Sequence, residues 1–307
     1  MPKVLLATEK PFAQTAKDGI SKIFKEAGFE LSLLEKYTDK ADLIKAVADA
    51  DAMIVRSDIV DDKVIQAAKN LKIVIRAGAG YDNIDLESAS RQGVVVMNTP
   101  GQNANAVAEL AIGMMIYLNR NFFNGTSGTE LRGKTIGIHA YGNVGKIVGY
   151  IAKGMGMDVL AHDPYVDKVI IENDGVKYVE DVKELYSKCQ YISVNLPAND
   201  ETKEFIDDKL LPLMPKGATL VNTARKEIIN ETSLLKMFGD RPDFRYISDI
   251  APDCKEQIAG TYEGRYYFTP KKMGAQTAEA NINAGLAAAR QIVNYILKGD
   301  TTFQVNS

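Results

Sequence analysis

Side chains that bind metals are scarce in this chain of 307 residues. The sequence has two histidines, His139 and His162, and two cysteines, Cys189 and Cys254. The cysteines lack the spacing of metal ligands, so we expect no metal site. The N-terminus runs directly into an apolar segment and not into a signal sequence, which favours a location in the reducing cytoplasm.

The chain also lacks an excess of charge of either sign and any long apolar run. Its 37 Lys and Arg stand against 40 Asp and Glu, a net charge of -3, which gives no reason to expect nucleic acid or an anionic membrane as a partner. The longest apolar run, residues 106–118, is interrupted by Glu109 and is too short to span a bilayer, so it predicts a buried helix. An anionic ligand must therefore be bound by groups gathered locally.

A motif for binding a pyrophosphate lies in the middle of the chain. In KTIGIHAYGNVG, residues 134–145, an apolar strand runs into a glycine turn that opens a helix. Gly142 allows close approach of the anion, and Gly145 allows the helix to pack on the strand. Ala140 replaces the first glycine of the usual pattern, so a simple strand-to-helix turn stays an alternative. Asp163 lies 18 residues after Gly145, where an acid accepts hydrogen bonds from a ribose and favours NAD over NADP.

Short apolar segments alternate with room for helices along the whole chain. Continuous apolar strands joined by helical crossovers are typical of parallel sheets covered on both faces. Pro100 and Gly101 break the first series, and the helical segment 278–297 is expected to return to the first lobe. We therefore predict an α/β protein with two doubly wound parallel-sheet lobes. A Rossmann NAD-binding lobe, residues 101–276, is inserted into a flavodoxin-like substrate-binding lobe, residues 1–100 and 277–307.

Four further segments resemble the D-2-hydroxyacid dehydrogenase family: residues 76–85, 94–110, 220–230 and 273–285. With the nucleotide motif, the resemblance extends over essentially the whole chain. Within the family, the sequence is similar to short 3-phosphoglycerate dehydrogenases that lack a regulatory domain. Because the chain stops at Ser307, we expect no attached module through which serine inhibits.

The resemblance also implies a homodimer formed through the nucleotide-binding lobe. The segment 119–133 is the only long loop-like stretch in the sequence. It is either a surface loop or an arm that contacts the partner subunit.

The family's carboxylate-binding arginine falls on Arg225, in the segment LVNTAR. A planar guanidinium grips a carboxylate with two hydrogen bonds and polarises the neighbouring carbonyl, a task for which lysine is a poor replacement. A structural ion-pair arginine is the alternative. The family's acid-base histidine is replaced by Lys272 in TPKKMGAQT, and the histidines that are present belong to the nucleotide-binding strands.

The glutamate that orients the family's histidine is also replaced, here by Cys254. The two replacements agree, because an ammonium has no tautomer to fix and carries three donors. Asp253 or Glu256 would be the acid that assists. A lysine ordinarily titrates near about 10.4, so proton transfer at neutral pH requires burial or nearby positive charge. A non-catalytic, NAD-sensing interaction protein is the alternative.

Residues that end two strands of the first lobe are implied to bind the substrate. They are Arg56, Ser57, Arg76, Ala77 and Gly78. Two arginines and a run of backbone amides suit a phosphate together with a carboxylate. Lys10 is a weaker candidate, and ordinary surface arginines are the alternative. The resemblance implies cofactor contacts, besides the nucleotide motif and Asp163, from Ala79, Asn143, Val144, Leu196, Pro197, Thr202, Thr223, Ala224, Asp249, Gly274 and Ala275.

We therefore expect NAD-dependent oxidation of 3-phospho-D-glycerate to 3-phosphohydroxypyruvate, the serine-biosynthesis reaction, with the two lobes closing over the cleft. A glyoxylate or hydroxypyruvate reductase on the same scaffold is the alternative enzyme.

Overall fold

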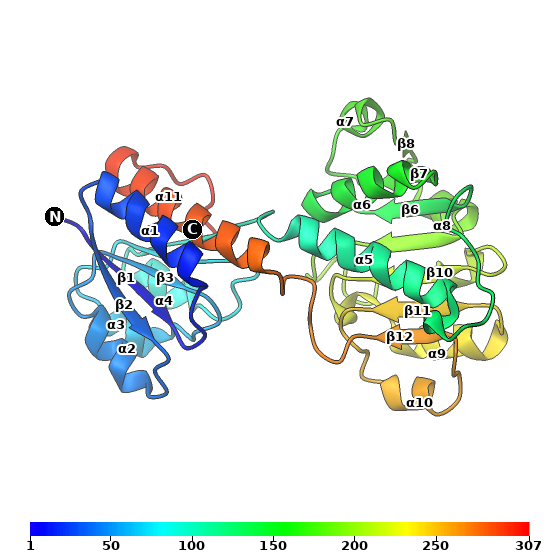
Figure 1. Cartoon of the computed structure of the whole chain (residues 1–307), viewed down its shortest axis with the longest axis horizontal. Coiled ribbons are helices and arrows are strands. Elements are labelled where there is room, and N and C mark those ends of the chain that lie inside the picture. The colour runs from blue at the N-terminus through cyan, green and yellow to red at the C-terminus, as the bar shows by residue number, and fades with distance from the viewer. Residues whose placement is uncertain (307) are drawn as a thin grey trace. The chain divides into compact units, whose positions relative to one another are not determined.

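The computed structural model of the chain describes residues 1–306 and forms two compact units (Figure 1). Unit 1 comprises Met1–Asn103 and Gln276–Ser307, and unit 2 comprises Ala104–Ala275. Each unit is a parallel sheet with helices on both faces. The predicted α/β class with two parallel sheets is confirmed.

Unit 1 contains a five-stranded sheet in the order β2-β1-β3-β4-β5, with every pair parallel. This is the strand order of flavodoxin-like folds. Its strands are β1 (Lys3–Thr8), β2 (Glu30–Glu35), β3 (Ala52–Val55), β4 (Ile73–Arg76) and β5 (Val95–Asn98). Its helices are α1 (Gln14–Glu26), α2 (Lys40–Val47), α3 (Asp62–Ala67), α4 (Leu86–Arg91) and α11 (Ala278–Lys298).

Alternating side chains along these strands bury two separate cores. In β1, Val4 and Leu6 face the core beneath α1 and α11, which lie side by side in Figure 1, while Leu5 and Ala7 face α2 and α3. After α11, the Asn306 side chain accepts a hydrogen bond from the Val96 backbone N–H at 2.7 Å, so the C-terminal tail lies along β5. Residues far apart in the sequence therefore complete one unit.

Unit 2 contains a seven-stranded parallel sheet in the order β12-β11-β10-β9-β6-β7-β8. Counted from β6, this is the Rossmann order extended by one strand. Its strands are β6 (Thr135–His139), β7 (Asp158–His162), β8 (Lys177–Tyr178), β9 (Tyr191–Val194), β10 (Thr219–Asn222), β11 (Arg245–Ser248) and β12 (Tyr266–Phe268). Its α-helices are α5 (Ala104–Asn119), α6 (Asn143–Gly154), α7 (Lys168–Asn173), α8 (Val182–Lys188), α9 (Glu231–Asp240) and α10 (Lys255–Ala259), and its short 3₁₀ turns are η1 (Asn121–Phe123), η2 (Leu211–Leu213) and η3 (Lys226–Ile228).

The two faces of this sheet are covered by different helices. Helices α5 and α6 pack on one face, against Ile136 and Val221, and α8 and α9 pack on the other, against Ile192 and Leu220. The apolar run that predicted a buried helix is α5, which buries most of its residues. No helix of residues 1–306 has the length and apolarity needed to cross a bilayer.

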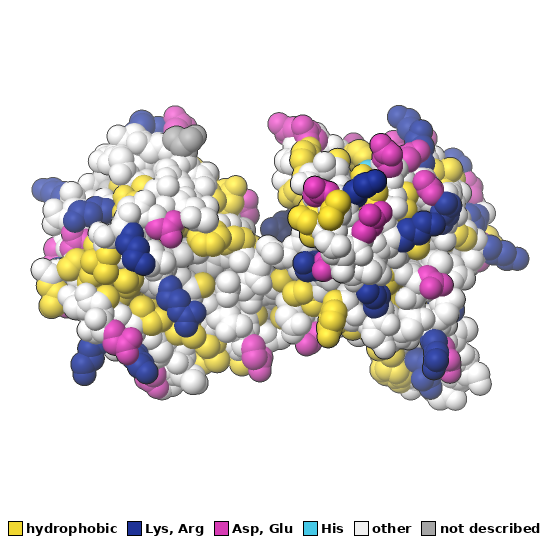
Figure 2. Space-filling model, turned by 90° about the horizontal axis from the view of Figure 1, so that it is seen from above, with side chains coloured by type: hydrophobic (Ala, Val, Ile, Leu, Met, Phe, Trp, Pro, Cys, Tyr) yellow, Lys and Arg dark blue, Asp and Glu magenta, His cyan; other side chains and the backbone are white. Residues whose placement is uncertain are grey.

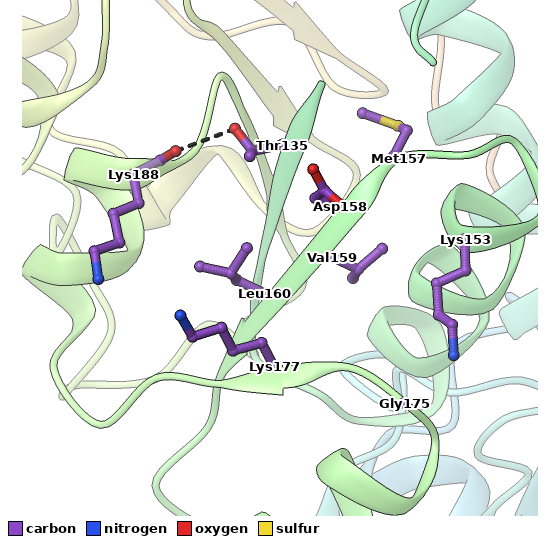
Figure 3. Close-up of a pocket in the computed structure, with 9 residues that line it drawn as sticks. All are labelled: Thr135, Lys153, Met157, Asp158, Val159, Leu160, Gly175, Lys177 and Lys188. Atoms are coloured by element: carbon purple, nitrogen blue, oxygen red, sulfur yellow. Dashed lines mark hydrogen bonds between the residues drawn. The ribbon is translucent and has the colours of Figure 1, made fainter. Parts of the chain in front are cut away.

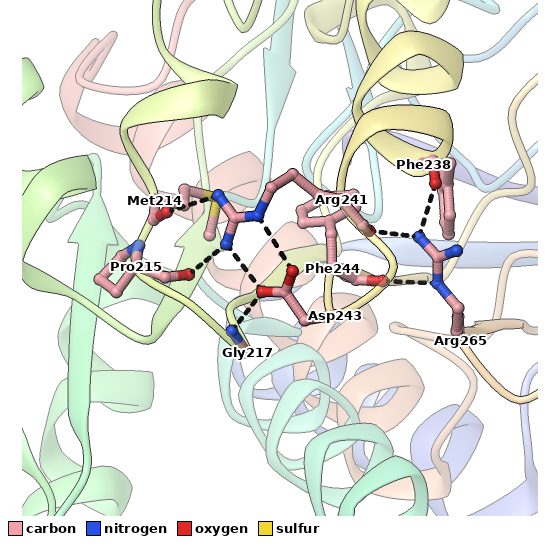
Figure 4. A network of polar contacts seen from close by, with 8 residues as sticks. All are labelled: Met214, Pro215, Gly217, Phe238, Arg241, Asp243, Phe244 and Arg265. Atoms are coloured by element: carbon pink, nitrogen blue, oxygen red, sulfur yellow. Dashed lines mark hydrogen bonds and ion pairs between the residues drawn. The ribbon is translucent and has the colours of Figure 1, made fainter.

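A network of two arginines fixes the sheet edge where β11 and β12 begin (Figure 4). Arg241 donates two hydrogen bonds to Asp243, at 3.0 and 2.7 Å, and Asp243 also accepts from the Gly217 backbone N–H at 2.6 Å. Arg265 donates to the carbonyl oxygens of Phe244 and Phe238. These bonds tie the segments before β10, β11 and β12 together.

Basic and acidic side chains are interspersed on the molecular face drawn in Figure 2, and neither sign forms a continuous patch there. This agrees with the small net charge of the chain.

Candidate active site

Strand β6 enters a tight turn before α6. Ala140 has a left-handed conformation there, with φ 72°, which glycine adopts freely and alanine at a cost of about 1–2 kcal/mol. A β-carbon on Gly145 would lie 2.2 Å from the Ala140 carbonyl oxygen, so helix and strand pack closely only with glycine. A β-carbon on Gly142 would have no atom of residues 1–306 within 4 Å. The chain does not itself require glycine at position 142, and the space beside it is open.

Helix α6 begins at this turn without a side-chain cap. Its N-cap is Gly142, its first residues are Asn143 and Val144, and no side chain in the described part of the chain caps it. Helices α9 and α11 are instead capped by Asn230 and Thr277. The N–H groups at the start of α6 and the positive end of its dipole therefore form an anion site beside the open space.

The predicted ribose ligand Asp163 lies just after β7 and is 7% exposed. Its Oδ2 accepts a hydrogen bond from the Tyr141 backbone N–H at 2.7 Å, and its Oδ1 accepts one from the Tyr165 backbone N–H at 2.8 Å. These bonds hold the carboxylate against the glycine turn. Each oxygen retains acceptor capacity for a ligand hydroxyl.

The loops after β9 and β10 contain buried oxygens that have no protein donor. Thr202 Oγ1 donates to the Pro197 carbonyl at 2.6 Å and closes the turn after β9, while Leu196 packs against the core. Asn195 Oδ1 and Thr223 Oγ1 are buried and make no hydrogen bond within residues 1–306. Because buried polar atoms are ordinarily paired, these two mark positions that a ligand would satisfy.

Arg225 follows β10 in a turn that Asn222 shapes. The Asn222 side chain accepts a hydrogen bond from the Ala224 backbone N–H and donates one to the Arg225 carbonyl, both at 2.9 Å. The Arg225 Nη1 donates to the Ala224 carbonyl at 3.0 Å, and the side chain is partly buried. This bond uses one of five guanidinium donors, so the others are available for a carboxylate. Asn222 was not identified from the sequence, although it stands in the same motif.

Asp249 organises the loop that carries Lys272. This carboxylate is 1% exposed and accepts hydrogen bonds from the backbone N–H groups of Met273 and Gly274, at 2.7 and 2.8 Å. The Thr269 hydroxyl donates to it at 3.1 Å. Lys272 lies between these anchors and is exposed. The burial that would favour a neutral lysine is therefore not present in this structure.

Neither histidine lies among the catalytic candidates. His139 ends β6 and is buried, with Nδ1 3.2 Å from the Tyr186 hydroxyl. Burial, with a smaller effect from His162, lowers the pKa of His139 to about 3, so the ring is neutral at physiological pH. His162 ends β7, and its Nδ1 lies 3.0 Å from the Val179 carbonyl oxygen.

A carboxylate does lie beside Cys254, but it comes from Glu231. The two oxygens of Glu231 accept hydrogen bonds from the backbone N–H groups of Asp253 and Cys254, both at 2.7 Å. Burial first, and then Glu231, raises the pKa of the Cys254 thiol to about 12. Asp253 is 2.5 Å from the Lys226 ammonium, and the Glu256 side chain is 85% exposed. The acid beside Cys254 is therefore Glu231, the first residue of α9, which is partly buried. The predicted candidates, Asp253 and Glu256, do not take this position.

The predicted catalytic and cofactor residues of unit 2 share one edge of its sheet. All seven strands are parallel, so the loops that follow them lie at the same carboxyl edge. The loops after β6, β7, β9, β10, β11 and β12, together with the first turn of α6, contain Gly142, Asn143, Val144, Gly145, Asp163, Leu196, Pro197, Thr202, Thr223, Ala224, Arg225, Asp249, Lys272, Gly274 and Ala275.

The predicted substrate residues of unit 1 end β3 and β4 or follow them. They are Arg56, Ser57, Arg76, Ala77 and Gly78, and the predicted cofactor contact Ala79 comes next. Arg76 Nε donates to the Arg56 carbonyl at 3.0 Å. The Arg76 guanidinium covers Gly78, where a β-carbon would lie 1.4 Å from Nη1, and Gly78 has φ 151°. This backbone segment therefore requires glycine at position 78.

Arg56 is held by its own unit. Its Nη1 donates to the Lys10 carbonyl at 2.9 Å, and its Nη2 donates to Asn281 Oδ1 on α11. The guanidinium also lies over the Phe12 ring, 5.0 Å from the centroid. The buried carboxylate of Asp58 accepts from the Arg56 backbone N–H at 3.1 Å. Arg56 thus supports the loop that carries Lys10, and sequence reasoning did not identify its partners Asn281 and Asp58.

A cavity of about 600 Å³ lies at the opposite edge of the unit 2 sheet (Figure 3). Its lining includes Thr135 and Asp158, which begin β6 and β7, and the lysines Lys153, Lys177 and Lys188. The three ammonium groups point in different directions in Figure 3 and do not converge on a ligand position. Because the cavity lies where the strands begin and the candidate active site lies where they end, the two are separate. In the described residues, no group of three or more His, Cys, Asp or Glu side chains is arranged to hold a metal ion.

Comparison with known proteins agrees with this geometry. The chain matches the D-isomer specific 2-hydroxyacid dehydrogenase, catalytic domain, over residues 8–306. It is 34% identical to D-3-phosphoglycerate dehydrogenase of Methanocaldococcus jannaschii over 295 residues, which cover 91% of this chain and 55% of that protein. It is 32% identical to hydroxypyruvate reductase of Thermotoga maritima, covering 86% of this chain and 90% of that protein. The chain thus spans about half the length of the archaeal relative and most of the bacterial one.

Among solved structures, the chain is similar to an NAD⁺-bound 3-phosphoglycerate dehydrogenase of Entamoeba histolytica. The two are 47% identical, with a TM-score of 0.86 over 100% of this chain and 99% of that one. The protein belongs to the D-isomer specific 2-hydroxyacid dehydrogenases.

Proposed function

We propose that this protein oxidises 3-phospho-D-glycerate to 3-phosphohydroxypyruvate with NAD, as a step of serine biosynthesis. The observation that carries the proposal is the likeness to the NAD⁺-bound 3-phosphoglycerate dehydrogenase of Entamoeba histolytica, which extends over the whole chain at 47% identity. Its relatives of the same name in archaea and mammals support the same substrate.

The carboxyl edge of unit 2 fits NAD, which when bound supplies the acceptor for the hydride. The open space at Gly142 and the uncapped start of α6 suit the pyrophosphate. Asp163 is oriented to accept hydrogen bonds from the adenosine ribose, and its negative charge disfavours the 2'-phosphate of NADP. Thr223 Oγ1 offers a buried polar atom that bound cofactor or substrate would satisfy.

We assign the chemistry at C2 of the substrate to Arg225 and Lys272. Arg225 binds the carboxylate and the C2 oxygen, held in place by the turn that Asn222 fixes. Lys272 Nζ accepts the proton of the C2 hydroxyl as the hydride leaves C2. Asp249 fixes the backbone next to Lys272 and so positions this base.

We assign the substrate phosphate to unit 1. Arg76 offers a cation at the end of β4, and Ser57 adds a hydroxyl after β3. The backbone N–H groups of Ala77 and Gly78 already donate to the carbonyls of Val55 and Arg76, so the side chains carry this assignment. Arg56 acts mainly through the loop that it supports, because two of its guanidinium nitrogens already donate to that loop and to Asn281.

A hydroxypyruvate reductase is the second candidate function. It is favoured by the Thermotoga maritima relative, of which this chain covers 90%. The two proposals differ in whether a phosphate group on the substrate matters. We expect the substrate phosphate to matter, because unit 1 presents the Arg76 guanidinium and the Ser57 hydroxyl at the ends of its strands.

The experiment is a substrate panel in the direction of reduction. NADH oxidation is followed with 3-phosphohydroxypyruvate, hydroxypyruvate and glyoxylate. We expect kcat/KM for the phosphorylated substrate to exceed the others by about 100-fold, the contribution of a charge-assisted phosphate contact of about 2.7 kcal/mol. Preference for hydroxypyruvate or glyoxylate would establish the alternative enzyme, and binding of NADH without turnover of any of the three would favour an NAD-sensing protein.

We also propose that the protein is a cytoplasmic homodimer formed through unit 2. Phe123, in the segment after α5, is 64% exposed, and Tyr150 on the neighbouring helix α6 is 79% exposed. Large exposed aromatic side chains of this kind are enriched at subunit contacts. Light scattering during size-exclusion chromatography should give twice the chain mass of 33.6 kDa, and the monomer mass would refute the dimer.

A further inference from the structure

An exposed tyrosine joins the two loops that flank the glycine turn. Tyr165 follows β7, and Glu201 lies in the turn after β9. The Tyr165 hydroxyl donates to Glu201 Oε2 at 3.1 Å. Strands β7 and β9 both pair with β6, one on each side, so this bond links the loops on either side of the strand that enters the turn.

The same tyrosine is bonded to the ribose acid. Its backbone N–H donates to Asp163 Oδ1 at 2.8 Å, so one residue connects Asp163 to Glu201. The hydrogen bond from Tyr165 to Glu201 raises the pKa of the Tyr165 hydroxyl, and the charges of Glu201 and Asp163 add to this effect. The Tyr165 side chain therefore lies in the field of two carboxylates.

Core packing does not account for this arrangement. Tyr165 is 83% exposed, and neither it nor Glu201 belongs to the hydrophobic cores of unit 2. The turn that carries Glu201 is nevertheless well fixed, because Asn199 Oδ1 accepts hydrogen bonds from the backbone N–H groups of Glu201 and Thr202, at 3.1 and 3.0 Å. The carboxylate of Glu201 is thus held by a fixed turn and by the hydroxyl of the tyrosine whose backbone N–H donates to Asp163.

We propose that Glu201 is a second determinant of cofactor choice, whose charge adds to that of Asp163 in excluding a 2'-phosphate. This inference rests on the proposed function, because it takes the adenosine ribose of NAD to lie at Asp163. The two acids act differently. Asp163 is buried and accepts hydrogen bonds from the ribose, whereas Glu201 is exposed and acts on the 2'-phosphate through its charge.

Two consequences follow from the exposure of Glu201. Its effect on a phosphate is weakened by salt, because interactions between exposed charges are screened over about 10 Å at 0.1 M ionic strength. Replacing Asp163 alone leaves one repelling carboxylate in place, so NADP should bind well only when both acids are neutralised.

The test compares the binding of NAD and NADP by titration calorimetry for the wild type, Glu201→Gln, Asp163→Ser and the double variant. Glutamine keeps an oxygen for the Tyr165 hydroxyl and removes only the charge. We expect Glu201→Gln to lower the Kd for NADP about three- to tenfold at low salt, the effect of one exposed carboxylate on a phosphate dianion, with the Kd for NAD changed less than about twofold. In 0.5 M salt the gain for NADP should largely disappear.

Two further variants test whether the effect on NADP binding depends on the position of the Glu201 charge or only on the total negative charge of the turn. Asp200→Asn removes a carboxylate from the neighbouring residue of the same turn and should change the Kd for NADP less than Glu201→Gln does. Tyr165→Phe keeps the ring and the backbone bond to Asp163 but loses the hydroxyl that holds Glu201. It should therefore give part of the effect of Glu201→Gln.

The outcomes distinguish the inference from the function on which it rests. If the wild type binds NAD and Glu201→Gln leaves NADP binding unchanged, the inference is wrong and the proposed function stands. Equal effects of Asp200→Asn and Glu201→Gln on the Kd for NADP would also overturn the inference, because the total negative charge of the turn would then explain the result without a specific role for Glu201. A wild type that binds neither nucleotide would overturn the proposed function and the inference together.

Discussion

At the scale of single residues, the two glycines of the nucleotide turn have different requirements. Gly145 is needed by the chain itself, because a β-carbon there would meet the Ala140 carbonyl at 2.2 Å. Gly142 has no such neighbour among the described residues, so the space on its side of the turn is open. The sequence pattern assigns both glycines to the motif, but it does not distinguish the one that helix packing requires from the one that leaves space beside the turn.

We predict that Gly142→Ala folds normally and binds NAD about tenfold more weakly or worse, because its methyl group enters the space of the pyrophosphate. Titration calorimetry with NAD and a thermal unfolding curve measure the two effects. The matched variant Gly145→Ala should instead lose about 2 kcal/mol or more of unfolding free energy. A Gly142→Ala protein with wild-type NAD affinity would show that the pyrophosphate lies elsewhere.

Lys272 is the residue on which the proposed proton transfer depends. Lys272→Ala should lower kcat for 3-phosphoglycerate oxidation about 100-fold or more with NAD binding intact, and wild-type oxidation should rise toward alkaline pH because only a neutral lysine accepts a proton. Lys272→His should recover little activity, because Cys254 stands in the place of the orienting glutamate and both oxygens of the neighbouring Glu231 already accept backbone hydrogen bonds.

Lys271 is the control for this prediction, since it is the adjacent lysine and is also exposed. Steady-state kinetics of both alanine variants decide the assignment. Loss of turnover in Lys271→Ala alone would assign proton transfer to Lys271. Wild-type turnover in both variants would refute a lysine as the proton acceptor.

At the scale of helices and strands, long apolar segments were predictable and short or distant features were not. The parallel strands of both units and the buried helix α5 follow from their apolar runs. Strand β8 has two residues, Lys177–Tyr178, which is too short to give a periodic pattern. The site partners Glu231 and Asn281 were missed because each bonds a residue far away in the sequence, at separations of 23 and 225 positions.

The Arg241–Asp243 pair, at the edge where β11 and β12 begin, predicts how the stability of unit 2 depends on pH. The hydrogen bond from Arg241 holds the pKa of Asp243 below its usual range, against an opposing effect of burial. Its stabilising contribution is therefore complete above the unfolded-state pKa of about 3.9, and it is lost as the pH falls through the lower folded-state value.

Asp243→Asn should lower the free energy of unfolding by about 1–2 kcal/mol at pH 7, since it weakens charge-assisted bonds to Arg241 and Gly217. Urea denaturation at several pH values checks this, and the difference from wild type should shrink below about pH 4. Asp240→Asn, which breaks an exposed pair with Lys236, should cost less than about 0.5 kcal/mol. A pH-independent difference for Asp243→Asn would show that its charge is not the cause.

At the scale of the whole molecule, the sequence predicted the family and the grouping of site residues at strand ends. It did not predict which of these residues the protein itself uses as structural supports. Arg56 is an example, since its contacts with the carbonyl of Lys10 and with Asn281 depend on how the chain folds back in unit 1. A motif identifies the residue type, whereas the three-dimensional contacts distinguish a ligand-binding residue from one that holds a loop.

The activity that we propose is NAD-dependent oxidation of 3-phospho-D-glycerate. The most direct test is the initial rate of NADH formation by the wild-type protein, followed by absorbance, with 3-phospho-D-glycerate and with D-glycerate as its phosphate-free counterpart. We predict NADH formation with 3-phospho-D-glycerate and a kcat/KM for D-glycerate at least about 100-fold lower, because the phosphate contacts of unit 1 are lost. Equal rates with the two substrates, or no NADH from 3-phospho-D-glycerate, would contradict the account.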